Sequence, residues 1–482
     1  MVIVIQPGNE TMEEKKNIKS SGYYRNKKIR DQMVEFLGGT TLSTSSAVYI
    51  TRCDIPASDQ YEKRPPVDLD FYLNNGLDIC RSLWDRDSLI IDLDIEYVNY
   101  DFPAEAYLDP IRTFSLQHPV HNAVEEILLQ YNIIALNLLS GRGHHFTWRI
   151  KKKSQAFDLL KNIGRVSQDL LNYYKSNRGP EGEEVDVSLG KAFSGIALVM
   201  EYVAHLIKRK AGPLSKLPLE LAAVEVTPQE RGREMISIDI TEYGDPLTTR
   251  MIRLPFSVYL KPWYKYGILN ESTRGNMPFI FMIPRNNLEI NHAIRIMRDE
   301  KKAASLAITS AVRIPDQSDF MSALIAEYQQ SDLADFHTRF YSLEHHHPET
   351  WPNTYDRLSM KDLPPCIQYI LMHPNDLLQK PGGIRLVVRS LLALDWHPRH
   401  IAGLIRSKYE RDYGWGHHWY TYDASLRADF YVRVFAGQIE VGLDNLNDFN
   451  CTSTKGMHYC FDNNQSCTLD TLRANLLKRK KS

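Results

Sequence analysis

The sequence has no excess of either charge, no long hydrophobic run and few cysteines. Its 58 Lys and Arg residues balance 59 Asp and Glu residues, and the net charge is −1. Overall basicity therefore does not indicate a nucleic-acid-binding protein, and any such surface must be a local patch. No stretch approaches the roughly 18–20 apolar residues of a membrane span, so we expect no membrane partner. Six cysteines in 482 residues argue against a secreted disulfide scaffold, and we expect a cytoplasmic protein.

The length and the order of the apolar patterns predict more than one domain. A chain of 482 residues exceeds one ordinary hydrophobic core. Patterns typical of strands and helices mix through about residue 270, which predicts an α+β domain over residues 1–290 with mixed sheets and flanking helices. We expect a helical linker over residues 291–355 and a mostly α-helical domain over residues 356–482.

Periodicity places the individual elements. A spacing of two between apolar residues predicts strands, and a spacing of three or four predicts helices. The predicted strands are Leu89–Tyr97, Ile133–Leu139, Phe146–Ile150, Met235–Thr241 and Met251–Leu254. The predicted helices are Val120–Tyr131, Ala156–Tyr174, Ala192–Lys208, Asn291–Thr309 and Phe320–Tyr341.

Acidic residues stand at every second position of the strand Leu89–Tyr97, L-I-I-D-L-D-I-E-Y. Because side chains alternate along a strand, Asp92, Asp94 and Glu96 project from one face. Like charges on one face cost stability, which a bound cation would offset. Asp239, on a second apolar strand, is a further carboxylate, and hard divalent cations such as Mg²⁺ or Mn²⁺ prefer such oxygen ligands. The alternative is that these acids are solvated residues on an exposed sheet.

Two further motifs carry groups suited to phosphates. The turn Ser140–His145, S-G-R-G-H-H, combines glycines with Arg142 and imidazoles, although a hairpin turn needs no ligand to explain its glycines. Downstream, Arg253, Ser257 and Lys261 recur every four residues in R-M-I-R-L-P-F-S-V-Y-L-K. Such a cluster suits triphosphate oxygens, and its alternative is a solvated basic edge.

The order of these motifs resembles the archaeo-eukaryotic primase superfamily. This family includes primase small subunits, primase-polymerases and the polymerase domain of bacterial end-joining ligases, and the resemblance covers Leu89–Trp263. It implies a primase-type catalytic domain in which Asp92, Asp94 and Asp239 bind the catalytic Mg²⁺ or Mn²⁺ ions. The implied nucleotide-binding residues are Ser140, Arg142, Gly143, His145, Arg253, Ser257 and Lys261.

The chain departs from the family pattern in places. Many relatives read S-L-H where this chain has Ser257, Val258 and Tyr259, so a phosphate contact by a second histidine is not expected here. His145 fits the family histidine better than His144 because it takes the last place of the motif. The motif does not require Glu96, which is either a partner of the metal ligands or an alternative to Asp94.

Four cysteines fall in the last quarter of the chain, at Cys366, Cys451, Cys460 and Cys467. Zinc sites usually use paired C-x-x-C ligands, and these wider spacings suit a four-cysteine iron–sulfur cluster better. Zinc and unligated thiols are the alternatives, and His458 is a substitute ligand. We expect the two remote cysteines, Cys53 and Cys80, to be plain thiols.

Residues 355–470 resemble the iron–sulfur domain of the primase large subunit, on L-P-P-C-I and the helical G-G-I-R-L-V-V-R that follows. The resemblance implies a 4Fe-4S cluster and a surface for the template and the initiating nucleotide. The candidate residues of this surface are Arg385, Arg389, His397, Arg399, Lys408, Trp415, Trp419 and Tyr420. These residues are equally well explained as a helical surface with core aromatics.

The two resemblances together imply a DNA-dependent primase-polymerase, a nucleotidyltransferase that makes and extends primers on single-stranded DNA from nucleoside triphosphates. A helicase or another replication protein is a candidate partner. The alternatives are a gap-filling repair polymerase without primer initiation and an inactive nucleic-acid-binding protein. A nuclease with the same carboxylates would not explain the phosphate-binding cluster.

Overall fold

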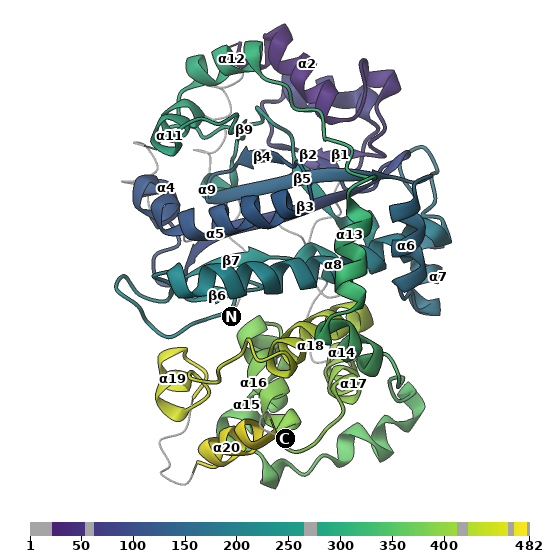
Figure 1. The fold of residues 1–482 in the computed structure, drawn as a ribbon, viewed down its shortest axis with the longest axis vertical. Coiled ribbons are helices and arrows are strands. Elements are labelled where there is room, and N and C mark those ends of the chain that lie inside the picture. The colour runs from purple at the N-terminus through teal and green to yellow at the C-terminus, as the bar shows by residue number, and fades with distance from the viewer. Residues whose placement is uncertain (1–21, 54–61, 265–276, 412–422, 461–466, 480–482) are drawn as a thin grey trace. The chain divides into compact units, whose positions relative to one another are not determined.

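The computed structural model describes residues 22–53, 62–264, 277–411, 423–460 and 467–479 (Figure 1). The fold is α+β, as the sequence predicts. The chain forms two compact units from interleaved segments. Unit 1 comprises Met1–Tyr97, Phe102–Gly195 and Leu247–Ser322, and unit 2 comprises Val98–Asp101, Ile196–Pro246 and Ala323–Ser482. The domains expected from the sequence were continuous stretches, whereas these units are not.

Unit 1 holds two antiparallel sets of strands. In the first set β2 (Ile79–Ser82) lies between β1 (Ile50–Arg52) and β8 (Met251–Arg253). In the second, the order is β3 (Ser88–Asn99), β5 (Gly143–Lys151), β4 (Leu136–Leu139) and β9 (Ile283–Pro284).

Unit 1 also contains α-helices and short 3-10 helices. The α-helices are α2 (Lys27–Phe36), α3 (Leu69–Asn74), α4 (Glu105–Leu108), α5 (Pro110–Gln130), α6 (Gln155–Ile163), α7 (Gln168–Ser176), α9 (Lys261–Tyr264), α11 (Ile290–Met297) and α12 (Glu300–Thr309). The 3-10 helices are η1 (Tyr23–Arg25), η2 (Leu42–Thr44), η3 (Pro66–Asp68) and η6 (Leu247–Thr249).

Unit 2 is mostly helical and contains the parallel pair β6 (Leu219–Glu220) and β7 (Glu234–Asp239). Its α-helices are α13 (Met321–Gln329), α14 (Asp332–Phe340), α15 (Pro365–Met372), α16 (Pro381–Leu392), α17 (Pro398–Tyr409), α18 (Ala424–Glu440), α19 (Cys451–Gly456) and α20 (Leu469–Arg479). Its shorter helices are η4 (Gly212–Leu214), η5 (Thr241–Gly244), η7 (Pro348–Asn353), η8 (Tyr355–Arg357), η9 (Met360–Asp362) and the π-helix η10 (Pro374–Leu378). Within the unit, α18 packs against α14, α16 and α17.

The long helix α8 (Val187–Ala211) belongs partly to each unit. From the sequence we expected no stretch of the length and apolarity of a membrane span, yet Val187–Leu214 is long and apolar enough to pass a test of length and composition. Of its most apolar window, 72% is buried inside the protein, as in a core helix.

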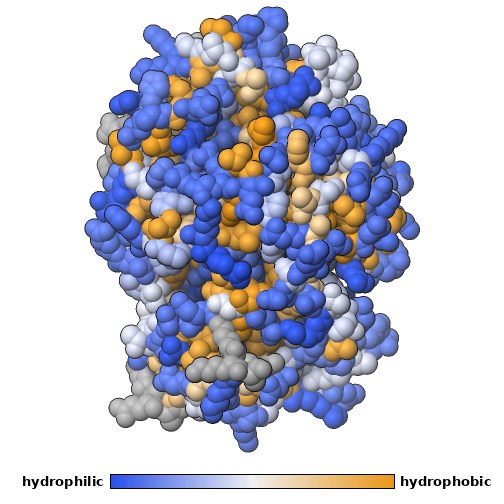
Figure 2. Space-filling view, viewed as in Figure 1, coloured by the Kyte–Doolittle hydropathy of each residue, from blue (hydrophilic) through white to orange (hydrophobic). Residues whose placement is uncertain are grey.

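Hydrophilic side chains cover much of the face shown in Figure 2, with apolar side chains between them.

Three predicted helices are each two helices in the structure. Ala156–Tyr174 is divided between α6 and α7, Asn291–Thr309 between α11 and α12, and Phe320–Tyr341 between α13 and α14. In each case the second helix begins at a Ser or Asp whose side chain accepts a hydrogen bond from the first turn. The predicted helix Val120–Tyr131 extends upstream, since α5 contains Pro119 within it.

The β3–β5 pair has one apolar face and one polar face. Ile91, Leu93 and Ile95 on β3 are fully buried, and their partners across the pair include Trp148 and Phe146. Helix α5 packs against β5 (Figure 1). The apolar face therefore anchors β3 in the core and fixes the direction of its acidic side chains.

Candidate functional site

The register of β3 and β5 brings the acidic strand and the S-G-R-G-H-H turn together. Asp92 pairs with Thr147, Asp94 with His145 and Glu96 with Gly143. Partners in an antiparallel pair lie on the same face, so His145 projects among the carboxylates. This geometry agrees with the choice of His145 over His144 as the motif histidine, because His144 projects from the opposite face.

His144 is a core residue. It is buried, and its ring lies 5.3 Å from that of Phe114 and 4.5 Å from that of His121, both on α5. Burial, and then the neighbouring His121 and Arg285, hold the pKa of His144 well below its usual range.

His145 is held by two carboxylates. Its Nδ1 lies 2.9 Å from Asp92 Oδ2, and its Nε2 lies 3.7 Å from Asp94 Oδ1. Burial lowers the pKa of this imidazole, but Asp94 and Asp92 outweigh burial and raise it to about 9. His145 is therefore an imidazolium at neutral pH, and it could donate a hydrogen bond to a phosphate oxygen.

Glu96 forms an ion pair with Arg142 of the turn. Burial acts to raise the pKa of Glu96, but Arg142 and then Lys261 outweigh burial and lower it to about 2. The same ion pair raises the pKa of Arg142 against the effect of burial. The carboxylates of β3 thus lie near three cationic groups, Arg142, His145 and Lys261. The sequence assigned all three to nucleotide binding.

The glycine of the turn has a packing function as well. A Cβ on Gly143 would lie 1.7 Å from the carbonyl oxygen of Ile95, so only glycine allows β5 to approach β3 here. Ser140 is buried, and its backbone N–H donates to the carbonyl oxygen of Gly143 at 2.9 Å. These contacts form the hairpin without a ligand.

Asp239 belongs to unit 2, where it ends β7. Its Oδ1 accepts hydrogen bonds from the backbone N–H of Thr241 at 2.9 Å and from the Thr241 hydroxyl at 2.6 Å. Asp239 is partly exposed, while the preceding residues of β7 are buried. The lone acid of the predicted strand Met235–Thr241 thus sits where the strand ends.

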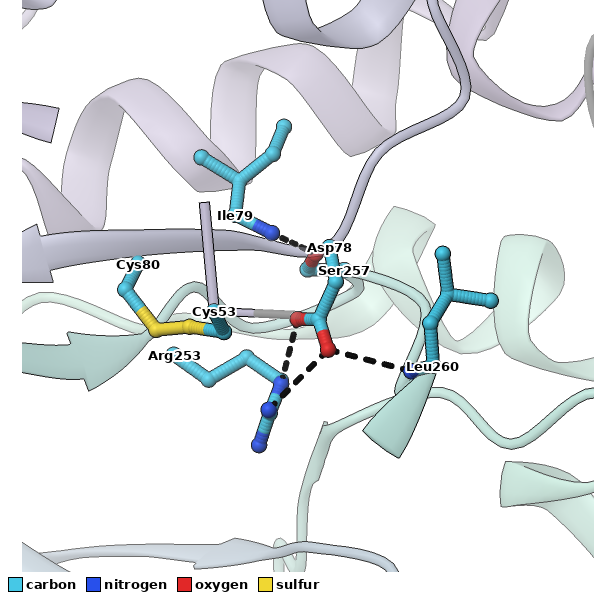
Figure 3. The surroundings of a disulfide bond; sticks show 7 residues. All are labelled: Cys53, Asp78, Ile79, Cys80, Arg253, Ser257 and Leu260. Carbon is cyan, nitrogen blue, oxygen red and sulfur yellow. Dashed lines mark hydrogen bonds and ion pairs between the residues drawn. A yellow bond between two sulfur atoms is a disulfide. The ribbon is translucent and has the colours of Figure 1, made fainter. Parts of the chain in front are cut away.

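Arg253 and Ser257 have structural partners in unit 1 (Figure 3). The Arg253 guanidinium donates to both oxygens of Asp78, from Nε at 2.6 Å and from Nη2 at 3.0 Å. Ser257 is fully buried, and its Oγ accepts the backbone N–H of Ile79 at 2.8 Å. Lys261 begins α9. The predicted cluster is therefore divided between the end of β8, a turn and a helix start.

The sequence did not reveal Asp78 as the residue that organises this region. Asp78 has no exposed surface and also accepts the backbone N–H of Leu260 at 3.0 Å. It precedes the buried strand β2, and a single acid before an apolar strand has no distinctive pattern. Tyr259, which replaces the family histidine, is buried with its ring centre 4.1 Å from the Arg253 guanidinium.

The expectation that Cys53 and Cys80 are plain thiols is wrong. They form a disulfide with a Cα–Cα distance of 5.8 Å (Figure 3). The cause is strand pairing: Cys80 lies opposite Thr51 in the β1–β2 register, which places Cys53 within reach. A separation of 27 residues gives no sign of this pairing.

The four late cysteines line one cavity of about 60 Å³ in unit 2. Cys366 lies in the first turn of α15 and Cys451 begins α19, while Cys460 and Cys467 lie in coil. Burial, and then the neighbouring cysteines, raise the pKa of the Cys366 thiol to about 12. His458, the substitute ligand, does not line this cavity.

The spacing of these thiols bears on which group they fit. Among the described residues, no three of the four sulfurs lie within 4.8 Å of one another. Four sulfurs around one zinc ion, each ~2.3 Å from the metal, would lie about 3.8 Å apart. The described sulfurs therefore do not lie at the spacing that one zinc ion would require.

The cations proposed for template binding are paired in unit 2. Arg385 bonds Glu220 at 2.7 Å and Asp448 at 2.9 Å. Arg389 bonds Asp444 at 2.8 Å. Both arginines are buried, so their charges are largely neutralised.

The remaining candidates of that surface have varied placements. Arg399 pairs with Asp429 at 2.7 Å, and His397 caps α17 by accepting the backbone N–H of Arg399. Lys408 lies in the last turn of α17. Trp415, Trp419 and Tyr420 lie outside the described residues.

Comparisons of the chain with protein families, with curated proteins and with solved structures found no match.

Proposed function

We propose that the protein is a DNA-dependent primase-polymerase that joins nucleoside triphosphates on a single-stranded DNA template. The observation that carries the proposal is the β3–β5 register, which pairs Asp94 with His145. Two motifs separated by about fifty residues thereby share one polar face. Carboxylates for divalent cations and cations for phosphates are the two sets of groups that nucleotidyl transfer requires.

Carboxylates are present for the divalent ions that the motifs imply. The motif order assigns Mg²⁺ or Mn²⁺ to Asp92, Asp94 and Asp239, and oxygen ligands suit these ions. Bound divalent ions would activate the attacking 3′-hydroxyl and stabilise the leaving pyrophosphate. The protein's own contribution is to orient the triphosphate and neutralise its charge, through Arg142 and His145.

The cysteine cavity supports a second part of the proposal. Cys366, Cys451, Cys460 and Cys467 would hold a 4Fe-4S cluster, and the surrounding helices would bind the template and initiating nucleotide. Because Arg385 and Arg389 are already paired with carboxylates, an initiating triphosphate would have to compete with these ion pairs. Unit 2 is thus proposed to contribute primer initiation, in the cytoplasm and together with a replication partner such as a helicase.

Primer synthesis on single-stranded DNA with labelled nucleotides tests the function. We expect primers from the wild-type protein and no product from Asp94→Asn. The matched control is Asp158→Asn, because the side chain of Asp158 on α6 is 61% exposed. Cys366→Ser should lose initiation while still extending a supplied primer.

Other results would assign a different function. Extension without initiation by the wild-type protein would indicate a gap-filling polymerase. Template binding without any synthesis would indicate an inactive nucleic-acid-binding protein. Full synthesis by Asp94→Asn would exclude the polar face of β3 as the catalytic site.

A further inference from the structure

The three acids of β3 share a face but not an environment. The exposed fraction of the side chain is 4% for Asp92, against 14% for Asp94 and 13% for Glu96. A metal ion that brings water and phosphate ligands needs access to its carboxylates. Asp92 is therefore the least suited of the three to bind such an ion.

Both oxygens of Asp92 accept hydrogen bonds from β5. Oδ1 accepts the Thr147 hydroxyl at 2.6 Å, and Oδ2 lies 2.9 Å from Nδ1 of His145. Thr147 is fully buried, so this arrangement is fixed by the core of the strand pair. Metal binding by Asp92 would break a buried hydrogen bond to a charged group, which is costly.

Asp94 and Glu96 are placed differently. Each offers a carboxylate oxygen, and these two oxygens lie within 4.8 Å of each other. The partner of Glu96 is Arg142, which the turn motif assigns to phosphate. A metal-bound nucleotide could replace this ion pair, because Glu96 would bind the metal and Arg142 would bind the phosphate. Each charged group would then keep a partner of opposite charge.

We infer that Asp92 is a positioning residue that holds His145, and that Asp94 and Glu96 supply the metal-binding oxygens of β3. The role of His145 in nucleotide binding rests on the proposed function. The assignment of metal binding to Asp94 and Glu96, and not to Asp92, does not. Asp92 fixes Nδ1 of the imidazole, which leaves Nε2 as the nitrogen that faces Asp94 and the incoming phosphates. Glu96, which the family motif does not require, becomes part of the metal site.

Binding of Mn²⁺ alone, followed by the electron paramagnetic resonance signal of the unbound ion, tests the division. We expect Asp94→Asn and Glu96→Gln each to weaken binding by more than about tenfold, the lower end of the losses seen for residues that only orient metal ligands. Asp92→Asn, which keeps the side-chain shape, should weaken it less than either, and Asp158→Asn should not change it. A larger loss from Asp92→Asn than from Glu96→Gln would overturn the inference.

Affinity for a non-hydrolysable nucleoside triphosphate analogue tests the positioning role. Asp92→Asn and His145→Gln should each weaken analogue binding, and the double variant should bind no worse than His145→Gln. Such non-additivity is expected when one residue acts through another. Additive losses, or an Asp92→Asn protein that binds like wild type, would show that Asp92 does not act through His145.

A further variant separates positioning from general damage to the fold. Thr147→Val removes the second hydrogen bond to Asp92 and should weaken analogue binding without affecting Mn²⁺ binding. Wild-type protein that makes no primers would refute the proposed function, yet the Mn²⁺ series would still decide between Asp92 and Glu96. The two proposals therefore fail by different measurements.

Discussion

The charge of His145 depends on carboxylates that surround it in the folded chain. Its pKa is raised to about 9 from 6.5, because Asp94 and Asp92 outweigh the effect of burial. A raised folded-state pKa contributes stability that is fully present below the unfolded value and is lost as the pH rises through the folded value. The loss should therefore fall between about pH 6.5 and pH 9.

We expect the free energy of unfolding of the metal-free wild type to drop across this window by on the order of 3 kcal/mol more than that of His145→Gln. Urea unfolding at a series of pH values measures the difference. His347→Gln, at an exposed histidine, is the control and should follow the wild type. Parallel curves for wild type and His145→Gln would show that the carboxylates do not hold the imidazolium.

Single residues show how far a sequence pattern determines a site. Alternation alone placed Asp92, Asp94 and Glu96 on one face, because the opposite face is continuously apolar and must be buried. It could not rank the three acids, since their ranking depends on Thr147 and Arg142, which approach only once β5 pairs with β3. Asp78 had no signal for the same reason.

At the scale of elements, helix boundaries were predicted less well than strand faces. The helical spacing of apolar residues continues across the junction of α6 and α7, so periodicity alone predicted one helix. The break is at Gly164, where an added Cβ would lie 1.8 Å from the carbonyl oxygen of Lys191. Ser167, whose side chain accepts the backbone N–H of Leu170 at 3.1 Å, was a readable N-cap signal for α7.

Within unit 2, a buried ion pair joins α8 to α18. Arg433 donates from Nε to Glu201 at 2.7 Å and from Nη1 to the Tyr341 hydroxyl at 2.8 Å. His337 of α14 also approaches Glu201, with Nε2 at 3.2 Å from Oε1. Burial acts to raise the pKa of Glu201, but His337 and Arg433 outweigh it and lower the pKa to about 2. Burial also lowers the pKa of His337 itself, so Arg433 is the cation that keeps the carboxylate ionised at neutral pH.

Arg433→Met should destabilise the protein by roughly 3–5 kcal/mol, because it leaves a buried carboxylate without its cation. The matched control is Arg339→Met, since Arg339 is 54% exposed and pairs with Glu440 near the surface. That change should cost about 0–1 kcal/mol. The double variant Glu201→Met/Arg433→Met should recover part of the loss in denaturant unfolding. Equal costs for both single changes would show that burial adds nothing to this ion pair.

At the scale of the whole molecule, the sequence predicted the class of fold but not how the chain is divided. Changes in composition along the chain can locate only continuous domains. The structure assigns residues 98–101 and 196–246 to the same unit as the late helices. This assignment depends on contacts between distant segments such as α8 and α18, which one sequence does not display.

The late cysteines make the strongest prediction about the molecule as a whole. Three elements contribute cysteines or cavity walls, namely α15, α19 and α20, and a bound cluster would tie them together. Protein purified without oxygen should be brown, contain about four irons per chain as the proposed 4Fe-4S cluster requires, and lose the iron in Cys366→Ser. Hydrogen exchange should then rise in those three elements while β3 and β5 of unit 1 stay protected.

The control is the double variant Cys53→Ser/Cys80→Ser, which removes the disulfide and should keep its iron. One zinc per chain, or protection of α15, α19 and α20 that does not depend on metal, would exclude the cluster and with it the proposed basis for primer initiation.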